Sequence, residues 1–220
     1  MIPYRDDSEL DLYESYDFQG WSLAVNGGII DVTSITVSGN EEFYAIFKLV
    51  EDIRTIVHEE YFTFSDDLIT VNLSGFGNSD DYTITGYGIV GPKVSLQGKV
   101  VIPRTHNNYP VVALGGFAPS KESPQYITHI FMQKAGEEDR FKPITQIYAY
   151  AFDSLSTLKY FEFENSDIRV IEQYAFRKCS LNADNLRLQD TNIIYLGQYA
   201  FNQGIFSTSK ANINLPSSLY

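Results

Sequence analysis

The chain has 220 residues, a net charge of -12 and 44% hydrophobic residues, which is typical of a folded protein and not of a disordered one. Residues 1–80 carry a charge of -13 and residues 81–220 a charge of +1, so we expect two separately built parts and no nucleic acid as partner. No apolar run reaches about 18 residues, so we expect no membrane insertion. A single cysteine excludes an internal disulfide framework.

The first part of the chain predicts short strands joined by glycine turns. Alternating β-branched and aromatic residues occupy 35–38 and 43–47, and an Asn-Gly-Gly turn precedes them at 26–28. The order of Gly20-Trp21, the glycine turn and Phe43-Tyr44-Ala45 resembles the Listeria–Bacteroides repeat, also called the internalin B-repeat family. This resemblance implies a β-grasp-like module over residues 1–50 with Trp21 in its core.

Residues 51–80 predict a connecting β segment. Strand-like runs occupy 61–64 and 68–73, and the stretch 74–81 is rich in Gly, Asn, Ser and Asp, which is typical of a loop. We place the boundary of the following domain, residues 81–220, in this loop.

A repeated motif organises that domain. An aliphatic residue, three further positions and then Ala-Phe occur at 147–152, 171–176 and 196–201, so that the phenylalanines are 24 and 25 residues apart. This period is typical of a leucine-rich solenoid, in which each coil buries its apolar face against its neighbours. We expect a short strand, then a helical turn, in each repeat. The predicted repeat core consists of Phe117, Ile147, Phe152, Ile171, Phe176, Leu196 and Phe201.

The first and last copies of the motif are irregular. Residues 109–117 form a divergent copy in which Gly116 replaces the alanine, and a charged insertion at 133–140 lengthens the next repeat. Residues 212–220 begin another copy and stop before its Ala-Phe segment, so we expect a truncated solenoid within a longer protein.

These repeats resemble the BspA-like leucine-rich repeat family over about residues 82–220. The resemblance rests on Ile102-Pro103, Leu215-Pro216, Ala175-Phe176 followed by Cys179, and the complete motif at 196–201. The predicted fold is therefore mainly β with short helical turns, a β-grasp-like module followed by a leucine-rich-repeat solenoid. Both resemblances imply extracellular, cell-wall-associated proteins that contact host or neighbouring cells.

Signs of catalysis are weak in this sequence. His58, His106 and His129 are far apart in the chain and lack metal-ligand spacing. The acidic pairs at 66–67 and 80–81 are typical of solvated loops, and calcium binding there is left open. We therefore expect neither an enzyme nor a cofactor.

The leading functional hypothesis is a non-catalytic cell-surface fragment that binds protein or glycan on a host or neighbouring cell. The alternative is a structural spacer, or a virion or surface-array component, without a ligand of its own. Candidate ligand contacts on the strand face are Tyr160, Glu162, Arg187 and Asn212. Since the repeated residues are expected inside the solenoid, we expect function in residues that do not repeat. The sequence leaves the oligomeric state open.

Overall fold

The computed structural model describes residues 4–6, 9–25, 27–31, 42–76, 83–136, 144–163, 165–181, 186, 188–204 and 215–219. The chain divides into two compact units, Met1–Ile53 and Arg54–Tyr220, and each is described by itself.

The described part of the first unit is an antiparallel pair of strands, β1 (Ser15–Ser22) and β2 (Tyr44–Val50). A register shift between Phe18 and Gly20 bends β1. Trp21 is half-buried and contacts the rings of Phe18 and Phe43 edge-on, with centroids 5.6 Å and 6.5 Å away. Trp21 is thus less enclosed than a core residue. Residues 32–41 lie outside the described part, and the β-grasp-like module stays a prediction.

From Arg54 onward, the predicted connecting segment belongs to the second unit. It contains η2 (Ile53–Thr55), η3 (Glu59–Tyr61), β3 (Phe62–Phe64), β4 (Ile69–Asn72) and η4 (Leu73–Phe76). Both strands pair antiparallel with β5 (Thr83–Pro92). The unit therefore begins at Arg54 and not in the loop at 74–81, because β5 shares its backbone hydrogen bonds with the segment before that loop.

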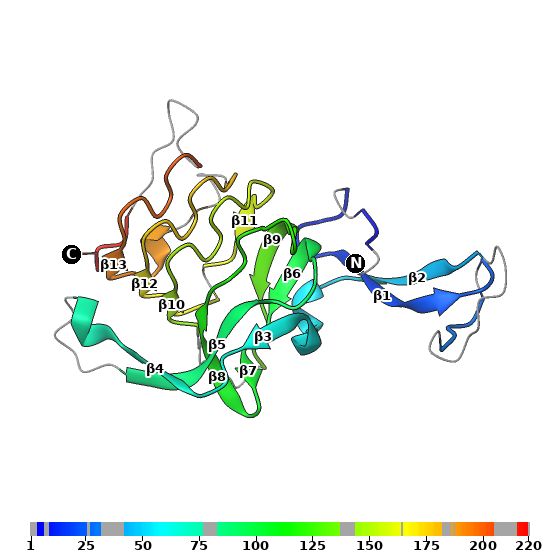
Figure 1. The fold of residues 1–220 in the computed structure, drawn as a ribbon, viewed down its shortest axis with the longest axis horizontal. Coiled ribbons are helices and arrows are strands. Elements are labelled where there is room, and N and C mark those ends of the chain that lie inside the picture. The colour runs from blue at the N-terminus through cyan, green and yellow to red at the C-terminus, as the bar shows by residue number, and fades with distance from the viewer. Residues whose placement is uncertain are drawn as a thin grey trace. The chain divides into compact units, whose positions relative to one another are not determined.

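Two sheets form a β-solenoid across residues 88–196, and strands of successive coils pair parallel within each. The protein is mainly β as predicted (Figure 1). The chain passes repeatedly from the first sheet to the second. The first sheet contains β5, β8 (Tyr109–Leu114), β10 (Gln146–Ile147), β12 (Val170–Ile171) and β13 (Tyr195–Leu196), in that order, and the second contains β6 (Gln97–Ile102), β9 (Tyr126–Met132) and β11 (Tyr160–Phe161).

Strand register places one aliphatic residue of each coil in a single row along the first sheet. The row consists of Ile89, Leu114, Ile147, Ile171 and Leu196. Ile89 marks an early coil that the repeated motif does not reveal, because Lys93 and Val94 follow it at the spacing where Ala-Phe follows in later coils. A short strand β7 (Thr105–His106) also joins β8 through Asn107-Asn108, both with positive φ, as a type I′ hairpin requires.

The predicted core residues line the interior with one exception. Phe117, Ile147, Phe152, Ile171 and Phe176 are fully buried, and Phe201 is 6% exposed. Leu196 is half-buried because β13 is the terminal strand of its sheet and has a neighbouring strand on one side.

The Ala-Phe segments are hydrogen-bonded turns and not helices. Residues 149–154 and 173–178 are turns throughout. We expect a short strand in each repeat, but ahead of β13 the structure has a 3-10 helix, η6 (Leu188–Asp190). Residues 182–185 and 187 lie outside the described part.

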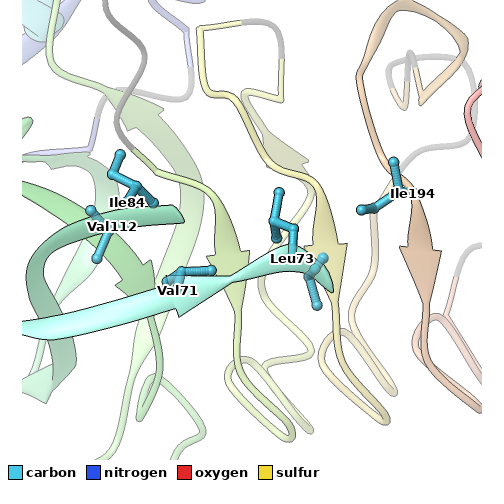
Figure 2. Packing of buried hydrophobic residues seen from close by; sticks show 6 residues of the cluster. Val71, Leu73, Ile84, Val112 and Ile194 are labelled. Atoms are coloured by element: carbon cyan, nitrogen blue, oxygen red, sulfur yellow. The ribbon is translucent and has the colours of Figure 1, made fainter. Parts of the chain in front are cut away.

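The segment β4–η4 covers the outer face of the first sheet. Val71 and Leu73 are buried in one cluster with Ile84, Val112, Val170 and Ile194, and Figure 2 shows this segment lying across the strands. At its end, the ring of Phe76 lies 5.0 Å from that of Tyr195. Much of this strand face is therefore closed to a ligand.

Candidate functional site

The structure describes two of the four strand-face candidates, Tyr160 and Glu162. Tyr160 is half-buried on β11 beside the rings of Phe131 and His129, 5.4 Å and 5.9 Å away. Arg187 and Asn212 lie outside the described residues. Only Tyr160 of the described candidates therefore has surface to offer a partner.

Glu162 does not lie on an exposed face, and this part of the prediction is wrong. Its residue exposure is 1%. One carboxylate oxygen accepts hydrogen bonds from Arg54 Nη1 (3.2 Å) and Asn165 Nδ2 (2.7 Å), and the other accepts one from the Met132 amide (2.8 Å). A buried carboxylate needs such partners. Glu162 links Arg54, at the start of the second unit, to the second sheet and is not available to a ligand.

The Ala-Phe turns form a continuous column inside the solenoid. The rings of Phe117, Phe152, Phe176 and Phe201 stack in succession at centroid distances of 4.9, 5.0 and 5.2 Å. Backbone hydrogen bonds tie the same turns together, from the amide of Phe152 to the Ala175 carbonyl and from that of Phe176 to the Ala200 carbonyl. This column, which we call the phenylalanine column, holds the coils in register.

A second column runs along the outside of the same turns. It consists of Tyr150, Tyr174 and Tyr199, each two residues before a phenylalanine of the column. Their rings stack at 5.0 Å and 5.3 Å with interplanar angles of 16° and 21°. Tyr150 and Tyr199 are 44% and 49% exposed. We call this set the tyrosine ladder, and it is the candidate functional site.

The ladder rests on an unusual backbone. Tyr150, Tyr174 and Tyr199 have φ of 60°, 58° and 59°, in the left-handed region that bulky residues rarely adopt. This conformation points their amides at the next coil, so that Tyr150 donates to the Gln173 carbonyl and Tyr174 to the Gln198 carbonyl, both at 3.1 Å. Turn geometry thus directs the tyrosines outward while the neighbouring alanine and phenylalanine point inward.

An ion pair flanks the ladder. The Arg177 guanidinium donates to both carboxylate oxygens of Asp153, at 2.7 Å and 2.5 Å, and lies 4.8 Å from the ring centre of Tyr174. Its hydrogen bonds hold the pKa of Asp153 below its usual range. The pair therefore stays charged at neutral pH, and its two charges balance beside the rings.

Cys179 lies behind the ladder and is not reactive. Its side chain is buried, and Sγ contacts the Phe152 carbonyl at 3.1 Å. Burial, with the nearby charge of Asp153, raises the pKa of this thiol to about 12. A protonated thiol is neither a nucleophile nor a metal ligand.

Each of the three histidines contacts a nearby carboxylate or hydroxyl group. His58 contacts Glu60 at 3.0 Å, and His106 contacts Glu59 at 2.9 Å. His129 contacts Thr128. Across the described ranges, no three His, Cys, Asp or Glu side chains gather as metal ligands. The same part of the chain contains no helix long and apolar enough to cross a membrane.

The repeated tyrosines are visible in the sequence, but their period does not show whether they are buried or exposed. Tyrosine precedes the phenylalanine by two positions in all three clear repeats. Repeated aromatic residues in a solenoid suggest core packing, and only the left-handed turn shows that these three lie outside. The expectation that all repeated residues lie inside the solenoid is therefore wrong for these tyrosines.

Comparison with known proteins supports the repeat assignment. Residues 131–220 match the family model described as BspA type leucine rich repeat region, in six copies. No curated protein and no solved structure matches the chain. The match does not extend to the first unit. The C-terminal part of the solenoid is thus similar to BspA-type leucine-rich repeats.

Proposed function

We propose that this chain is part of a bacterial cell-surface protein whose solenoid binds protein or glycan on a host or neighbouring cell, without catalysis. The similarity of residues 131–220 to BspA-type repeats supports the surface location. The observation that carries the binding role is the tyrosine ladder, a repeated aromatic surface on the same turns whose Ala-Phe pairs are buried. Tyrosine is enriched in protein binding surfaces because it is large, amphipathic and loses little entropy on contact.

A structural spacer is the competing function. The covering of the first sheet by β4–η4 favours it, because that covering removes a surface that a repeat protein would otherwise offer to a ligand. Under this hypothesis the solenoid sets distance and orientation on the cell surface, and the tyrosine ladder serves only to stack the turns.

Array binding distinguishes the two functions. The purified chain, labelled at its N-terminus, is applied to arrays of glycans and of host extracellular-matrix proteins, with heat-unfolded chain as a control for adhesion of apolar segments. We expect saturable binding by the folded chain alone. Blank arrays of both kinds, or equal binding by the unfolded chain, contradict the binding role and favour the spacer.

A further inference from the structure

We propose that the tyrosine ladder binds a neutral, extended β-linked polysaccharide, with one sugar ring beside each coil. This inference deepens the proposed function and rests on it, since it names the ligand class and the residues that contact it.

The first step is the conformational cost of the ladder. A bulky residue in the left-handed region costs roughly 1–2 kcal/mol relative to glycine or asparagine, and the chain bears this cost at Tyr150, Tyr174 and Tyr199. Two of these rings are almost half exposed, so burial offsets little of it. Each of the two stacked pairs contributes about 0.5–1.5 kcal/mol, so together they do not exceed the summed cost of three left-handed tyrosines. Stability therefore gives little reason for tyrosine at these positions, and strained residues of this kind are often functional.

The second step is the spacing of the ladder. Successive rings are 5.0 Å and 5.3 Å apart, the distance set by stacking of the coils. A β-1,4-linked chain of pyranose sugars advances by nearly the same length at each ring, so one sugar lies beside each tyrosine, although successive sugars are turned about the chain axis. A regular ladder thus fits a regular polymer.

Peptides match this spacing less well. An extended strand repeats its side-chain direction every ~6.6 Å, and a polyproline II helix repeats every ~9.3 Å. The side chains of an extended strand no longer coincide with the tyrosines after one coil. Those of a polyproline II helix coincide only with every second tyrosine. The spacing therefore favours a sugar polymer over a peptide.

The third step is the chemistry of the surface. The rings stack on one another, so their faces are occupied along the column, and exposed ring edges and hydroxyl groups remain for a ligand. The exposed residues Gln173 and Gln198 lie in the same turns, directly before Tyr174 and Tyr199. These groups donate and accept hydrogen bonds without net charge. Asp153 and Arg177 neutralise each other, so the surface suits a neutral ligand although the whole chain carries -12.

The test is calorimetric titration of the full chain with neutral β-1,4-linked hexasaccharides of glucose, xylose and mannose. The key variant is Tyr150→Asn/Tyr174→Asn/Tyr199→Asn, since asparagine tolerates positive φ and preserves the turns. We expect at least one hexasaccharide to bind the wild type and the triple variant to bind it at least tenfold more weakly. The matching disaccharide should bind more weakly than the hexasaccharide because it spans fewer coils.

The matched control is Tyr126→Thr, which removes a tyrosine of 47% exposure on β9, away from the ladder. It should bind like the wild type, and circular dichroism should show that both variants fold. Equal affinity of the triple variant and the wild type overturns the proposal. If no neutral glycan binds but a matrix protein does, the polysaccharide assignment fails and the proposed function stands. If neither array gives binding, both fail.

Discussion

The phenylalanine column and the tyrosine ladder lie two residues apart in the chain and on opposite sides of the same turn. Phe152 is fully buried, whereas Tyr150 is 44% exposed. Both stack on equivalent residues of neighbouring coils at about the same distance. Repetition in sequence therefore does not distinguish a residue that stabilises the fold from one that is available to a partner.

The rings of the two columns differ in their surroundings. A phenylalanine in the column displaces water and leaves a cavity when truncated. A tyrosine of the ladder remains in contact with water and occupies a backbone conformation better suited to glycine or asparagine. We therefore expect substitutions in the phenylalanine column to reduce stability. Substitutions in the tyrosine ladder should instead reduce binding.

The largest expected effect is that of Phe152→Ala. Phe152 stacks between Phe117 and Phe176 and is fully buried. Its truncation should lower the free energy of unfolding of the second unit by about 3–5 kcal/mol. Denaturant unfolding followed by circular dichroism measures this loss. A loss below about 1 kcal/mol, the scale of an ordinary substitution, would contradict the role of the column.

The next effect concerns the turn that has no tyrosine or alanine. Gly116, with φ of 74°, precedes Phe117, and a Cβ built on it would lie 1.7 Å from the Val90 carbonyl oxygen. Gly116→Ala should therefore cost more than about 1 kcal/mol in the same unfolding experiment. Gly136→Ala is the control, because nothing lies within 4 Å of its added Cβ. Equal costs for both variants would show that the close approach of the coils at Gly116 is not required.

A smaller effect is the acid sensitivity of the pair beside the ladder. The folded pKa of Asp153 lies below its unfolded value of about 3.9 because Arg177 donates hydrogen bonds to it. Its contribution to stability is therefore present above about pH 4 and is lost as the pH falls through the folded pKa. Urea midpoints at pH 7 and pH 3 should differ less for Asp153→Asn than for the wild type. An equal difference would show that the pair does not contribute.

The smallest expected effect on stability is that of Tyr150→Asn. Relief of the left-handed tyrosine gains roughly 1–2 kcal/mol, and loss of its stack on Tyr174 costs about 0.5–1.5 kcal/mol. The unfolding free energy should change by no more than about 1.5 kcal/mol, in contrast to Phe152→Ala in the same turn. A loss of about 3 kcal/mol or more would place Tyr150 in the core and end the distinction between the two columns.

The period of the repeat could be predicted from the sequence because it depends on local chemistry. A coil of constant length places equivalent residues in one row, and five of the seven predicted core residues are fully buried in that way. Ile89 was missed because its coil lacks Ala-Phe. Leu196 is less buried than predicted because β13 ends its sheet, which no local pattern reveals.

The candidate site was less predictable. Glu162 alternates with apolar residues as an exposed strand residue would, but Arg54, more than one hundred positions earlier, buries it through a direct ion pair. The tyrosines that replace it as candidates were present in every clear copy of the motif. Their exposure follows from positive φ at Tyr150, Tyr174 and Tyr199, which sequence patterns rarely indicate for bulky residues.

The sequence by itself determined that this protein is a repeat solenoid with phenylalanine between its coils, because hydrophobic period and burial are linked through coil length. Tertiary structure alone decided which surfaces remain open. Long-range contacts close the first sheet with β4–η4 and bury Glu162, and left-handed turns place tyrosines outside. Burial of a repeated residue is a local property of the coil, whereas its availability to a partner depends on segments distant in the chain and on backbone geometry.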